Sequence, residues 1–330
     1  MSRRYARQLA VPGFGAPGQA RLAAARALVV GAGGLAAPVL QYLAGAGVGR
    51  VVLVDPDRVE VSNLHRQTLF REGDVGEPKA LAAARHLAAL NPECRIEPVV
   101  GRLAPDTVAA LCEGVDAALD CADVFAASYV LSDHCLARGL PLVSASALGL
   151  SGYCGGFCGG APSLRAVFPD LPERLGRCAE DGVLGPVVGA IGAVQAQMAL
   201  AVLAGLSPSP LGRLVTFDAG AWRLGGFRFD DAPEPERAPR FIAPSAIRAD
   251  DFVVDLRAED EAPLATPEAL RLGVAEIGAG GPAPRPDQRA VLCCRSGLRS
   301  WQAAERLARV WPGEITMAAL GAADAEGRTR

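Results

Sequence analysis

The sequence predicts an α/β protein with a Rossmann-like, doubly wound and mainly parallel sheet, followed by a small C-terminal α/β domain. Three observations lead to this prediction. Residues 27–57 read as strand, glycine turn, helix and strand; strands and helices go on alternating to residue 146; and a second strand, loop and helix follow at residues 290–308. Such alternation is typical of parallel sheets with helices on both faces. The length of 330 residues suits about two domains.

The first βαβ unit predicts a nucleotide site. Its elements are a buried strand at 27–30, a turn at Gly31, Gly33 and Gly34, a helix at 35–46 and a buried strand at 50–54. The spacing Gly31-x-Gly33-x-x-Ala36 fits the dinucleotide fingerprint, and a helix N-terminus attracts phosphate. Asp55 follows where an acid can hold a ribose hydroxyl. The alternative is a glycine turn that serves packing alone.

The rest of the first domain continues the pattern to residue 229. We expect helices at 78–90, 124–138 and 186–206, parallel strands at 96–100, 117–119 and 141–146, a strand within the glycine-rich 149–160, and closing antiparallel strands at 213–218 and 222–229. Residues 230–240 are charged and proline-rich, which indicates a linker. The predicted domains are therefore 1–229 and 241–330.

Three charged residues are candidates for phosphate chemistry. Arg66 and Lys79 follow the glycine turn by a few tens of residues and could contact phosphates, although each could equally be a surface charge. Asp123 lies just past the fourth predicted strand. Mg²⁺ commonly takes one or two carboxylates together with phosphate oxygens, so Asp123 is a candidate Mg²⁺ ligand.

Two cysteines are candidate reactive thiols. Cys294 follows a buried strand at 290–293 and opens a loop, Cys294-Arg295-Ser296-Gly297-Leu298-Arg299, ahead of a helix that we expect to begin at Ser300. Loop amides, a helix dipole and two arginines would favour a thiolate there. The alternative is a buried structural cysteine, which fits Cys293 better. Cys178 lies in a polar loop and is the second candidate.

Composition excludes several classes of function. The net charge of −3 offers no basic surface for nucleic acid. The N-terminus lacks the apolar core of a secretion signal, and the apolar stretch at 186–206 contains two glutamines, so we expect a core or interface helix rather than a membrane span. Nine cysteines at irregular spacing suggest reduced thiols in the cytoplasm. The three histidines do not cluster, and the spacing of Cys154 and Cys158 does not suit zinc.

Residues 4–229 resemble the MoeB/ThiF/HesA family, the bacterial relatives of ubiquitin-activating enzymes. The resemblance rests on an ordered series of segments: RYARQ, VVGAGGL, LVDPD, SNLHRQ, GEPKA, DCAD, PLVSASA and GPVVGAIGAVQAQ. Residues 241–330 resemble a rhodanese domain, with VVDLR early and CRSGLRS as the active-site loop.

The resemblance implies an ATP- and Mg²⁺-dependent adenylyltransferase. It would activate the C-terminal glycine of a ubiquitin-like sulfur carrier that ends in Gly-Gly, as a homodimer, and pass on persulfide sulfur from a donor such as a cysteine desulfurase. The implied ATP-binding residues are Gly31, Gly33, Gly34, Asp55, Asp57, Ser62, Asn63, Arg66, Lys79 and Asp123. Arg7 would reach the active site of the other subunit, Cys178 would bond to the carrier terminus or its sulfur, and Cys294 would carry the persulfide.

Three departures from the family limit these expectations. The two C-x-x-C pairs that bind structural zinc are missing, the first being replaced by Ser163-Leu164-Arg165-Ala166, so we expect no zinc. Val124 replaces an asparagine. The rhodanese-like segment is short and lacks a GHIPGA stretch. The chain could therefore, as an alternative, be a scaffold that binds a carrier without transferring sulfur. The fingerprint would also fit an NAD-dependent oxidoreductase, but this sequence has no histidine or Tyr-Lys pair placed as an acid for hydride chemistry. The pathway served, whether molybdopterin, thiamine, tRNA thiolation or a natural product, stays open.

Overall fold

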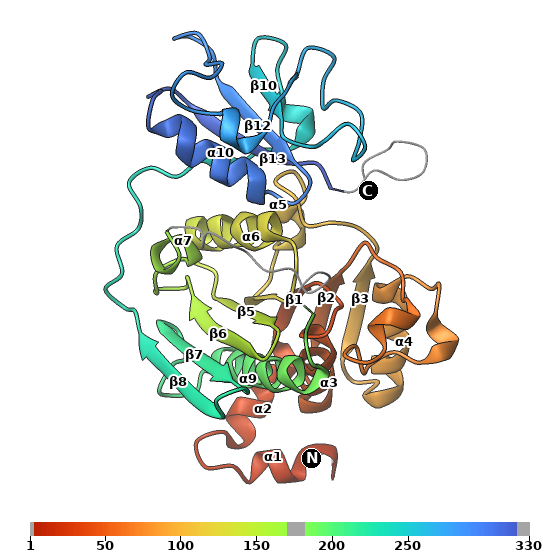
Figure 1. The fold of residues 1–330 in the computed structure, drawn as a ribbon. Coiled ribbons are helices and arrows are strands. Elements are labelled where there is room, and N and C mark those ends of the chain that lie inside the picture. Colours follow the sequence, from red (N-terminus) through yellow and green to blue (C-terminus); the bar gives the residue numbers. More distant parts are fainter. Residues whose placement is uncertain (1–2, 170–181, 322–330) are drawn as a thin grey trace. The chain divides into compact units, whose positions relative to one another are not determined.

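The computed structural model describes residues 3–169 and 182–321, which divide into two compact units (Figure 1). The first unit runs to Leu103 and includes Ala109–Asp123 and Leu131–Glu234. The second comprises Ala104–Val108, Val124–Val130 and the described residues from Pro235 onward. The division after Glu234 falls inside the predicted linker, residues 230–240.

An eight-stranded sheet in the order β3-β2-β1-β4-β5-β6-β7-β8 forms the centre of the first unit (Figure 1). Its strands are β1 (Arg26–Val30), β2 (Arg50–Val54), β3 (Arg95–Val99), β4 (Ala117–Asp120), β5 (Leu142–Leu148), β6 (Ser151–Phe157), β7 (Arg213–Asp218) and β8 (Arg223–Arg228). Strands β1 to β5 pair in parallel, and β5 to β8 pair antiparallel. The predicted doubly wound, mainly parallel α/β fold is therefore confirmed.

Several helices of the first unit share a core with alternate residues of these strands. The helical segments before residue 205 are η1 (Arg3–Tyr5), α1 (Ala6–Leu9), α2 (Gly15–Ala24), α3 (Ala36–Ala46), η2 (Val61–Asn63), η3 (Glu72–Asp74), α4 (Lys79–Leu90), α5 (Val108–Leu111), α6 (Phe125–Arg138), α7 (Leu164–Val167) and α9 (Gly185–Ala204). The first residue of α5 and residues 125–130 of α6 belong to the second unit. Ala27, Val29, Val51 and Leu53 point into one hydrophobic cluster with α3, α4 and α9. This period of two, with helices over the face, is what a parallel strand between packed layers requires.

The apolar helix α9 lies in this core. By length and composition α9 could cross a membrane, and it is the one such helix among the described residues. However, 56% of its most apolar 18-residue segment is buried inside the protein. It contacts α3 and strands β4, β5 and β6. Buried Gln195 donates from Nε2 to the carbonyl oxygens of Asp120 (2.7 Å) and Val143 (3.0 Å). The glutamine that argued against a membrane span therefore ties α9 to two strands of the sheet.

The second unit contains a five-stranded, all-parallel sheet in the order β11-β10-β12-β13-β9. Its elements are β9 (Arg240–Phe241), η4 (Pro244–Ala246), β10 (Phe252–Asp255), β11 (Leu270–Arg271), η5 (Val274–Glu276), β12 (Ala290–Cys294), α10 (Leu298–Ala308) and β13 (Ile315–Ala319). Two details differ from the sequence prediction. Cys294 ends the strand instead of opening the loop, and α10 begins at Leu298 instead of Ser300. The two-residue strands β9 and β11 are too short for a periodic pattern to predict.

Candidate active site

The glycine turn joins β1 to α3 in a backbone conformation that needs glycine. Gly31 has φ +93°, and a Cβ there would lie 2.7 Å from the carbonyl oxygen of Cys121. Its N–H donates to Val54 O at 2.8 Å. Within the described residues the N–H groups of Gly33 and Gly34 have no hydrogen-bond acceptor. Free amides at the start of an 11-residue helix form an anion-binding position.

Asp55, at the end of β2, fixes the shape of this turn. Its Oδ2 accepts a hydrogen bond from Ala32 N at 2.6 Å, and its Oδ1 accepts one from Asp57 N at 2.8 Å. Burial raises the pKa of this carboxyl, while nearby Lys79 and the two backbone N–H groups lower it. Asp55 thus supports the turn as well as being the predicted ribose ligand.

Lys79 is the only lysine in the 330 residues, because the other 32 of the 33 lysine and arginine residues are arginines. It begins α4, is 7% exposed, and places Nζ 3.0 Å from Asp57 Oδ2. Its backbone N–H also donates to Asp57 O at 2.9 Å. Lysine offers a compact ammonium where arginine offers a planar fork. A chain that otherwise uses arginine keeps lysine at this one buried position beside the glycine turn.

The loop that begins at η2 brings Ser62, Asn63 and Arg66 together. Asn63 Oδ1 accepts a hydrogen bond from Glu60 N (3.3 Å), and Arg66 Nη1 donates to Ser62 O (3.1 Å). A Cβ at Gly34 would lie 3.5 Å from Arg66 Cγ, which places the Arg66 side chain beside the turn. The structure therefore places Arg66 beside the glycine turn and links Ser62 to Arg66.

Asp123 follows the carboxyl end of β4, the strand next to β1. The strand ends on buried Asp120, which pairs with Val30 and accepts hydrogen bonds from Ser144 Oγ (2.8 Å) and Ala122 N (3.2 Å). Asp123 is exposed, and its carboxylate has no partner in the described part of the chain. It is thus free to bind a cation together with phosphate oxygens.

Gln67 is a residue that the sequence reasoning missed. It is 3% exposed, and its Oε1 has no hydrogen-bond partner in the structure. Its Nε2 lies 3.9 Å from the position that a Cβ of Gly33 would occupy. Buried amides are nearly always hydrogen-bonded, so this group is placed to meet a ligand at the turn. Gln67 is the last residue of the segment SNLHRQ, but nothing in that segment indicates that its side chain is buried without a hydrogen-bond partner.

One predicted site residue, Arg7, does not lie at the glycine turn of its own chain. Arg7 is exposed on α1, and its neighbours Tyr5 and Gln8 contact the opposite end of α3, where Gln8 Nε2 donates to Ala46 O at 2.9 Å. Within this chain Arg7 therefore does not complete the site. Cys178 lies outside the described residues.

The positions considered for zinc are occupied by other contacts. Cys154 and Cys158 are both buried; Cys154 Sγ contacts Met198 Sδ at 3.6 Å, and burial raises the pKa of Cys158 to about 12. Ser163 caps α7 and bonds through N and Oγ to the two carboxylate oxygens of Glu234, at 2.7 and 2.6 Å. Among the described residues no group of three or more His, Cys, Asp and Glu side chains could hold a metal ion.

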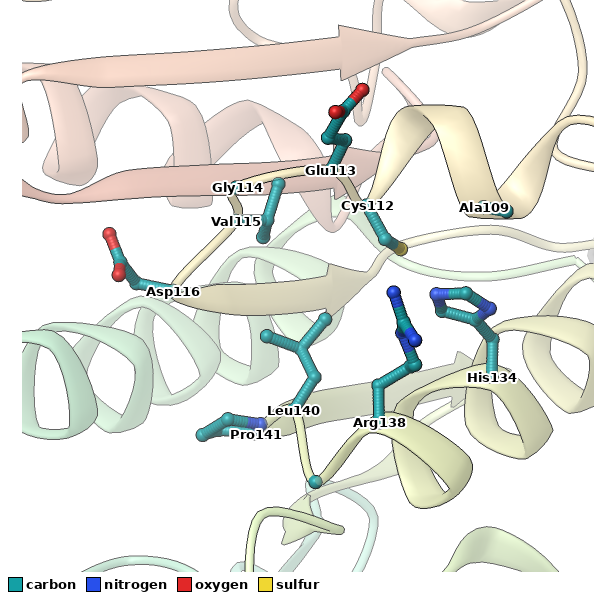
Figure 2. Close-up of a pocket in the computed structure, with 11 residues that line it drawn as sticks. Ala109, Cys112, Glu113, Gly114, Val115, Asp116, His134, Arg138, Leu140 and Pro141 are labelled. Carbon is teal, nitrogen blue, oxygen red and sulfur yellow. The ribbon is translucent and has the colours of Figure 1, made fainter.

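A hollow of about 550 Å³ lies at the amino ends of β4 and β5, opposite to the glycine turn (Figure 2). His134 and Arg138 point from α6 toward Cys112, whereas Glu113 and Asp116 point elsewhere (Figure 2). Burial lowers the pKa of His134, and Arg138 lowers it further. None of the predicted site residues lines this hollow.

In the second unit, Cys294 sits at the centre of a small cradle. Its Sγ accepts hydrogen bonds from Gly297 N (3.1 Å) and Ser300 N (3.4 Å), and Ser300 Oγ lies 3.3 Å away. Gly297 has φ +95°, which lets the loop turn back over the sulfur. N–H groups at the start of a helix favour a thiolate over a thiol.

The neighbouring cysteine has a different environment. Cys293 belongs to a hydrophobic cluster with Val253, Val291 and Ala318. Burial raises its pKa to about 12, and the nearby Asp255 raises it further. Cys293 therefore stays a neutral, structural thiol.

Comparison with known proteins places the first unit in a family. Residues 5–237 match the ThiF family. The chain is 49% identical over 220 residues to the adenylyltransferase and sulfurtransferase MOCS3 of Bos taurus, covering 66% of this chain and 48% of that protein. It is 41% identical over 218 residues to the SAMP-activating enzyme E1 of Haloferax volcanii, covering 66% and 81%.

The chain spans about half the length of the MOCS3 relative that it matches. A crystal structure of E. coli MccB with MccA-N7isoASN superposes with a TM-score of 0.63 at 20% identity, over 70% of this chain and 72% of that one, which shows a shared fold. Because the family match extends over more than half of the residues, the chain belongs to the ThiF family.

Proposed function

We propose that the chain is an ATP-dependent adenylyltransferase that activates the C-terminal glycine of a ubiquitin-like sulfur carrier. Residues 1–229 would perform adenylation, and residues 241–330, joined by the linker 230–240, would deliver persulfide sulfur. The main observation behind this proposal is the arrangement of charged residues near the glycine turn of a ThiF-family chain. Arg66 lies beside the turn, Lys79 pairs with Asp57 after β2, and Asp123 follows the neighbouring strand β4. The names of the two relatives, an adenylyltransferase and sulfurtransferase and a SAMP-activating enzyme, support the same activity.

In the proposed reaction a carboxylate oxygen of the carrier attacks the α-phosphorus of ATP, and the bond to the β-phosphate breaks. The products are an acyl adenylate and pyrophosphate. Two anions must approach one another, so positioned cations supply most of the rate enhancement. Lys79 and Arg66 would neutralise the phosphates, the N–H groups of Gly33 and Gly34 would donate hydrogen bonds to a phosphate oxygen, and Asp123 would hold Mg²⁺ against the phosphates.

Sulfur transfer would follow at Cys294. A persulfide on its Sγ attacks the acyl carbonyl, AMP leaves, and an acyl disulfide forms. A second thiolate then attacks the Cys294 sulfur, the S–S bond of the acyl disulfide breaks, and the carrier leaves as a thiocarboxylate. Cys294 is left in a disulfide with the attacking thiol, which an external thiol reduces before the next cycle. Cys178 is the predicted cysteine for covalent contact with the carrier terminus, and Arg7 would act in the site of a second subunit of a homodimer.

The unique lysine provides a direct test of nucleotide binding. An amine-reactive reagent can modify one side chain in these 330 residues, Lys79, apart from any free N-terminus. Mass spectrometry after labelling, with and without ligands, should show that ATP and Mg²⁺ protect Lys79 and that NAD⁺ does not. Protection by NAD⁺ alone would support the oxidoreductase alternative instead.

Adenylation is tested by ATP–pyrophosphate exchange with candidate carriers that end in Gly-Gly. We expect exchange with one carrier, and a loss of about 10²- to 10³-fold in Lys79→Ala and Asp123→Ala. Asp231→Asn, at the start of the linker, removes one carboxylate away from the turn and should retain full activity. Unchanged exchange in both site variants would refute the site, and no exchange with any carrier would favour the carrier-binding scaffold.

A further inference from the structure

An acidic residue is paired with the second arginine of the Cys294 loop. Glu261, in the loop after β10, meets the guanidinium of Arg299 through two bonds: Nη1 to Oε2 at 2.6 Å and Nη2 to Oε1 at 2.7 Å. Both side chains are about one-third exposed, at 29% for Arg299 and 32% for Glu261. Two parallel bonds of this kind fix the geometry as well as the charge of the pair.

The Glu261 carboxylate is held in place by its own loop. Its Oε2 also accepts a hydrogen bond from Ala258 N at 2.8 Å, and its backbone N–H donates to Ala258 O at 3.1 Å. The hydrogen bonds from Arg299 lower the pKa of Glu261 to about 2, and the charge of Arg295 contributes to the lowering. Glu261 is therefore ionised at every physiological pH.

This pairing changes the charge around the cradle. Arg299 is the second residue of α10, and the next residue, Ser300, donates its N–H to Cys294 Sγ. Arg257 is likewise neutralised, by a buried two-bond pair with Asp255 at 3.0 and 2.7 Å. Arg295 is exposed, and its side chain pairs with no other residue in the described ranges. Of the two arginines in the loop, Arg299 is paired with a carboxylate, whereas Arg295 forms no ion pair within the described ranges.

A dianionic sulfur donor and a persulfide respond differently to such a loop. Thiosulfate carries two negative charges, so the Glu261 carboxylate beside Arg299 would repel it more strongly than it would repel a singly charged donor. A persulfide carries at most one charge and avoids most of this repulsion, since like charges brought together at a binding site are unfavourable. The residue that cancels Arg299 can therefore discriminate between the two classes of donor.

We propose that Glu261 is a specificity-determining residue that disfavours dianionic donors such as thiosulfate and leaves persulfides as the sulfur source for Cys294. The proposal rests on the proposed sulfur-carrying role of the second unit. In both reactions the Cys294 thiolate attacks the sulfane sulfur of the donor, one S–S bond forms and the donor's bond to that sulfur breaks. The leaving group is sulfite from thiosulfate or a thiolate from a persulfide, so no oxidant or reductant is needed.

The experiment measures second-order rate constants for persulfide formation on Cys294, with thiosulfate and with cysteine persulfide as separate donors. In Glu261→Gln we expect the rate with thiosulfate to rise on the order of tenfold and the rate with cysteine persulfide to change less than about twofold. Glu259→Gln and Asp260→Asn are matched controls, because each removes one exposed acid from the same loop without touching Arg299. Both should keep the wild-type ratio of rates.

A second variant guards against a folding defect in Glu261→Gln. Arg299→Gln leaves the Glu261 charge uncompensated and should lower the thiosulfate rate below wild type, relative to cysteine persulfide. An unchanged donor ratio in both variants, or an equal shift in the two control variants, would overturn the role of Glu261. If neither donor loads Cys294 in the wild-type chain, the sulfur-carrying role itself fails, and this inference fails with it.

Discussion

The glycine turn of the first unit and the Cys294 loop of the second are built in the same way and differ in what their amides bind. Each follows a parallel strand that lies between two others, β1 between β2 and β4 and β12 between β10 and β13. Each uses a glycine at nearly the same φ, +93° at Gly31 and +95° at Gly297. The amides of Gly33 and Gly34 have no acceptor in the described part of the chain, whereas those of Gly297 and Ser300 bond to the sulfur of Cys294.

The difference shows that one backbone geometry can serve two kinds of anion. In the first unit the turn is left open for an anion that a ligand supplies. In the second unit the same kind of amides already contact a side chain of the chain itself, the sulfur of Cys294. The charged side chains are arranged differently only in part: Lys79 and Arg299 are both paired, with Asp57 and Glu261, whereas Asp123 after β4 has no partner among the described residues.

Substitution of the two adjacent cysteines should have the largest effect, because it tests whether the loop selects Cys294 as the reactive thiol. We expect Cys294→Ser to abolish persulfide formation, because a hydroxyl in the cradle cannot carry sulfur. Cys293→Ser should retain it, since Cys293 faces the hydrophobic cluster and has a raised pKa. Mass spectrometry after exposure to a persulfide donor provides the measurement. Sulfur found on Cys293 in the Cys294→Ser chain would show that the cradle does not select the reactive thiol.

Replacing Gly31 and Gly297 with alanine compares how strongly each of the two turns depends on its glycine. Gly31→Ala places a Cβ 2.7 Å from a backbone carbonyl oxygen, whereas the nearest atom to the Cβ of Gly297→Ala is in a side chain, the ring of Phe241 at 2.7 Å. We expect a loss of about 3 kcal/mol or more in the free energy of unfolding for Gly31→Ala and about 1–2 kcal/mol for Gly297→Ala. Urea denaturation measures both.

Gly33→Ala is the matched control for the first turn. Gly33 does not have positive φ, and the nearest atom to its added Cβ would be 3.9 Å away. Its stability should therefore stay within about 0.5 kcal/mol of wild type, whereas its affinity for ATP should fall if phosphate approaches the turn closely. A Gly31→Ala chain as stable as Gly33→Ala would mean that the turn is not constrained as described.

The sequence was sufficient to predict features that follow from local patterns. The strand–turn–helix order, Asp55 at a strand end and the cysteine ahead of α10 all lie within short segments. Because parallel strands end at the same edge, the gathering of Gly31, Asp55 and the residues after β4 also followed from the order of elements.

Features that depend on distant partners could not be predicted in this way. The pairs Ser163–Glu234 and Glu261–Arg299 join residues 71 and 38 positions apart, and neither has a periodic pattern to mark it. The unsatisfied amide of Gln67 depends on packing that no single segment specifies. The edge strand β9 begins at Arg240, the last residue of the predicted linker. Pairing of two residues with β13 is enough to form it, so no sequence pattern marks this strand.

The pH dependence of stability should reveal the electrostatic coupling at the open turn. A carboxyl with a raised pKa opposes folding when ionised, and this cost disappears as pH falls through its folded-state pKa. Lys79 lowers the pKa of Asp55, so Lys79→Met should destabilise the chain by about 1–2 kcal/mol at pH 7 and by less as Asp55 becomes protonated. Lys79→Arg keeps a cation and should show a smaller, flatter difference. Unfolding midpoints from pH 7 downward test this, and a gap that widens in acid would contradict it.

The smallest expected effect concerns the contact between Ser163 and Glu234 in the first unit. Ser163 bonds twice to Glu234, at 2.7 and 2.6 Å, and caps α7, so Ser163→Ala should cost about 1 kcal/mol of unfolding free energy. Glu234→Gln should cost a similar amount, and the double variant should cost less than the sum because the two residues share one contact. A strong chelator should leave the melting temperature of every variant unchanged. A chelator-dependent drop, or zinc found by metal analysis of the purified chain, would show that a metal stabilises this unit and that the serine–glutamate pair alone does not.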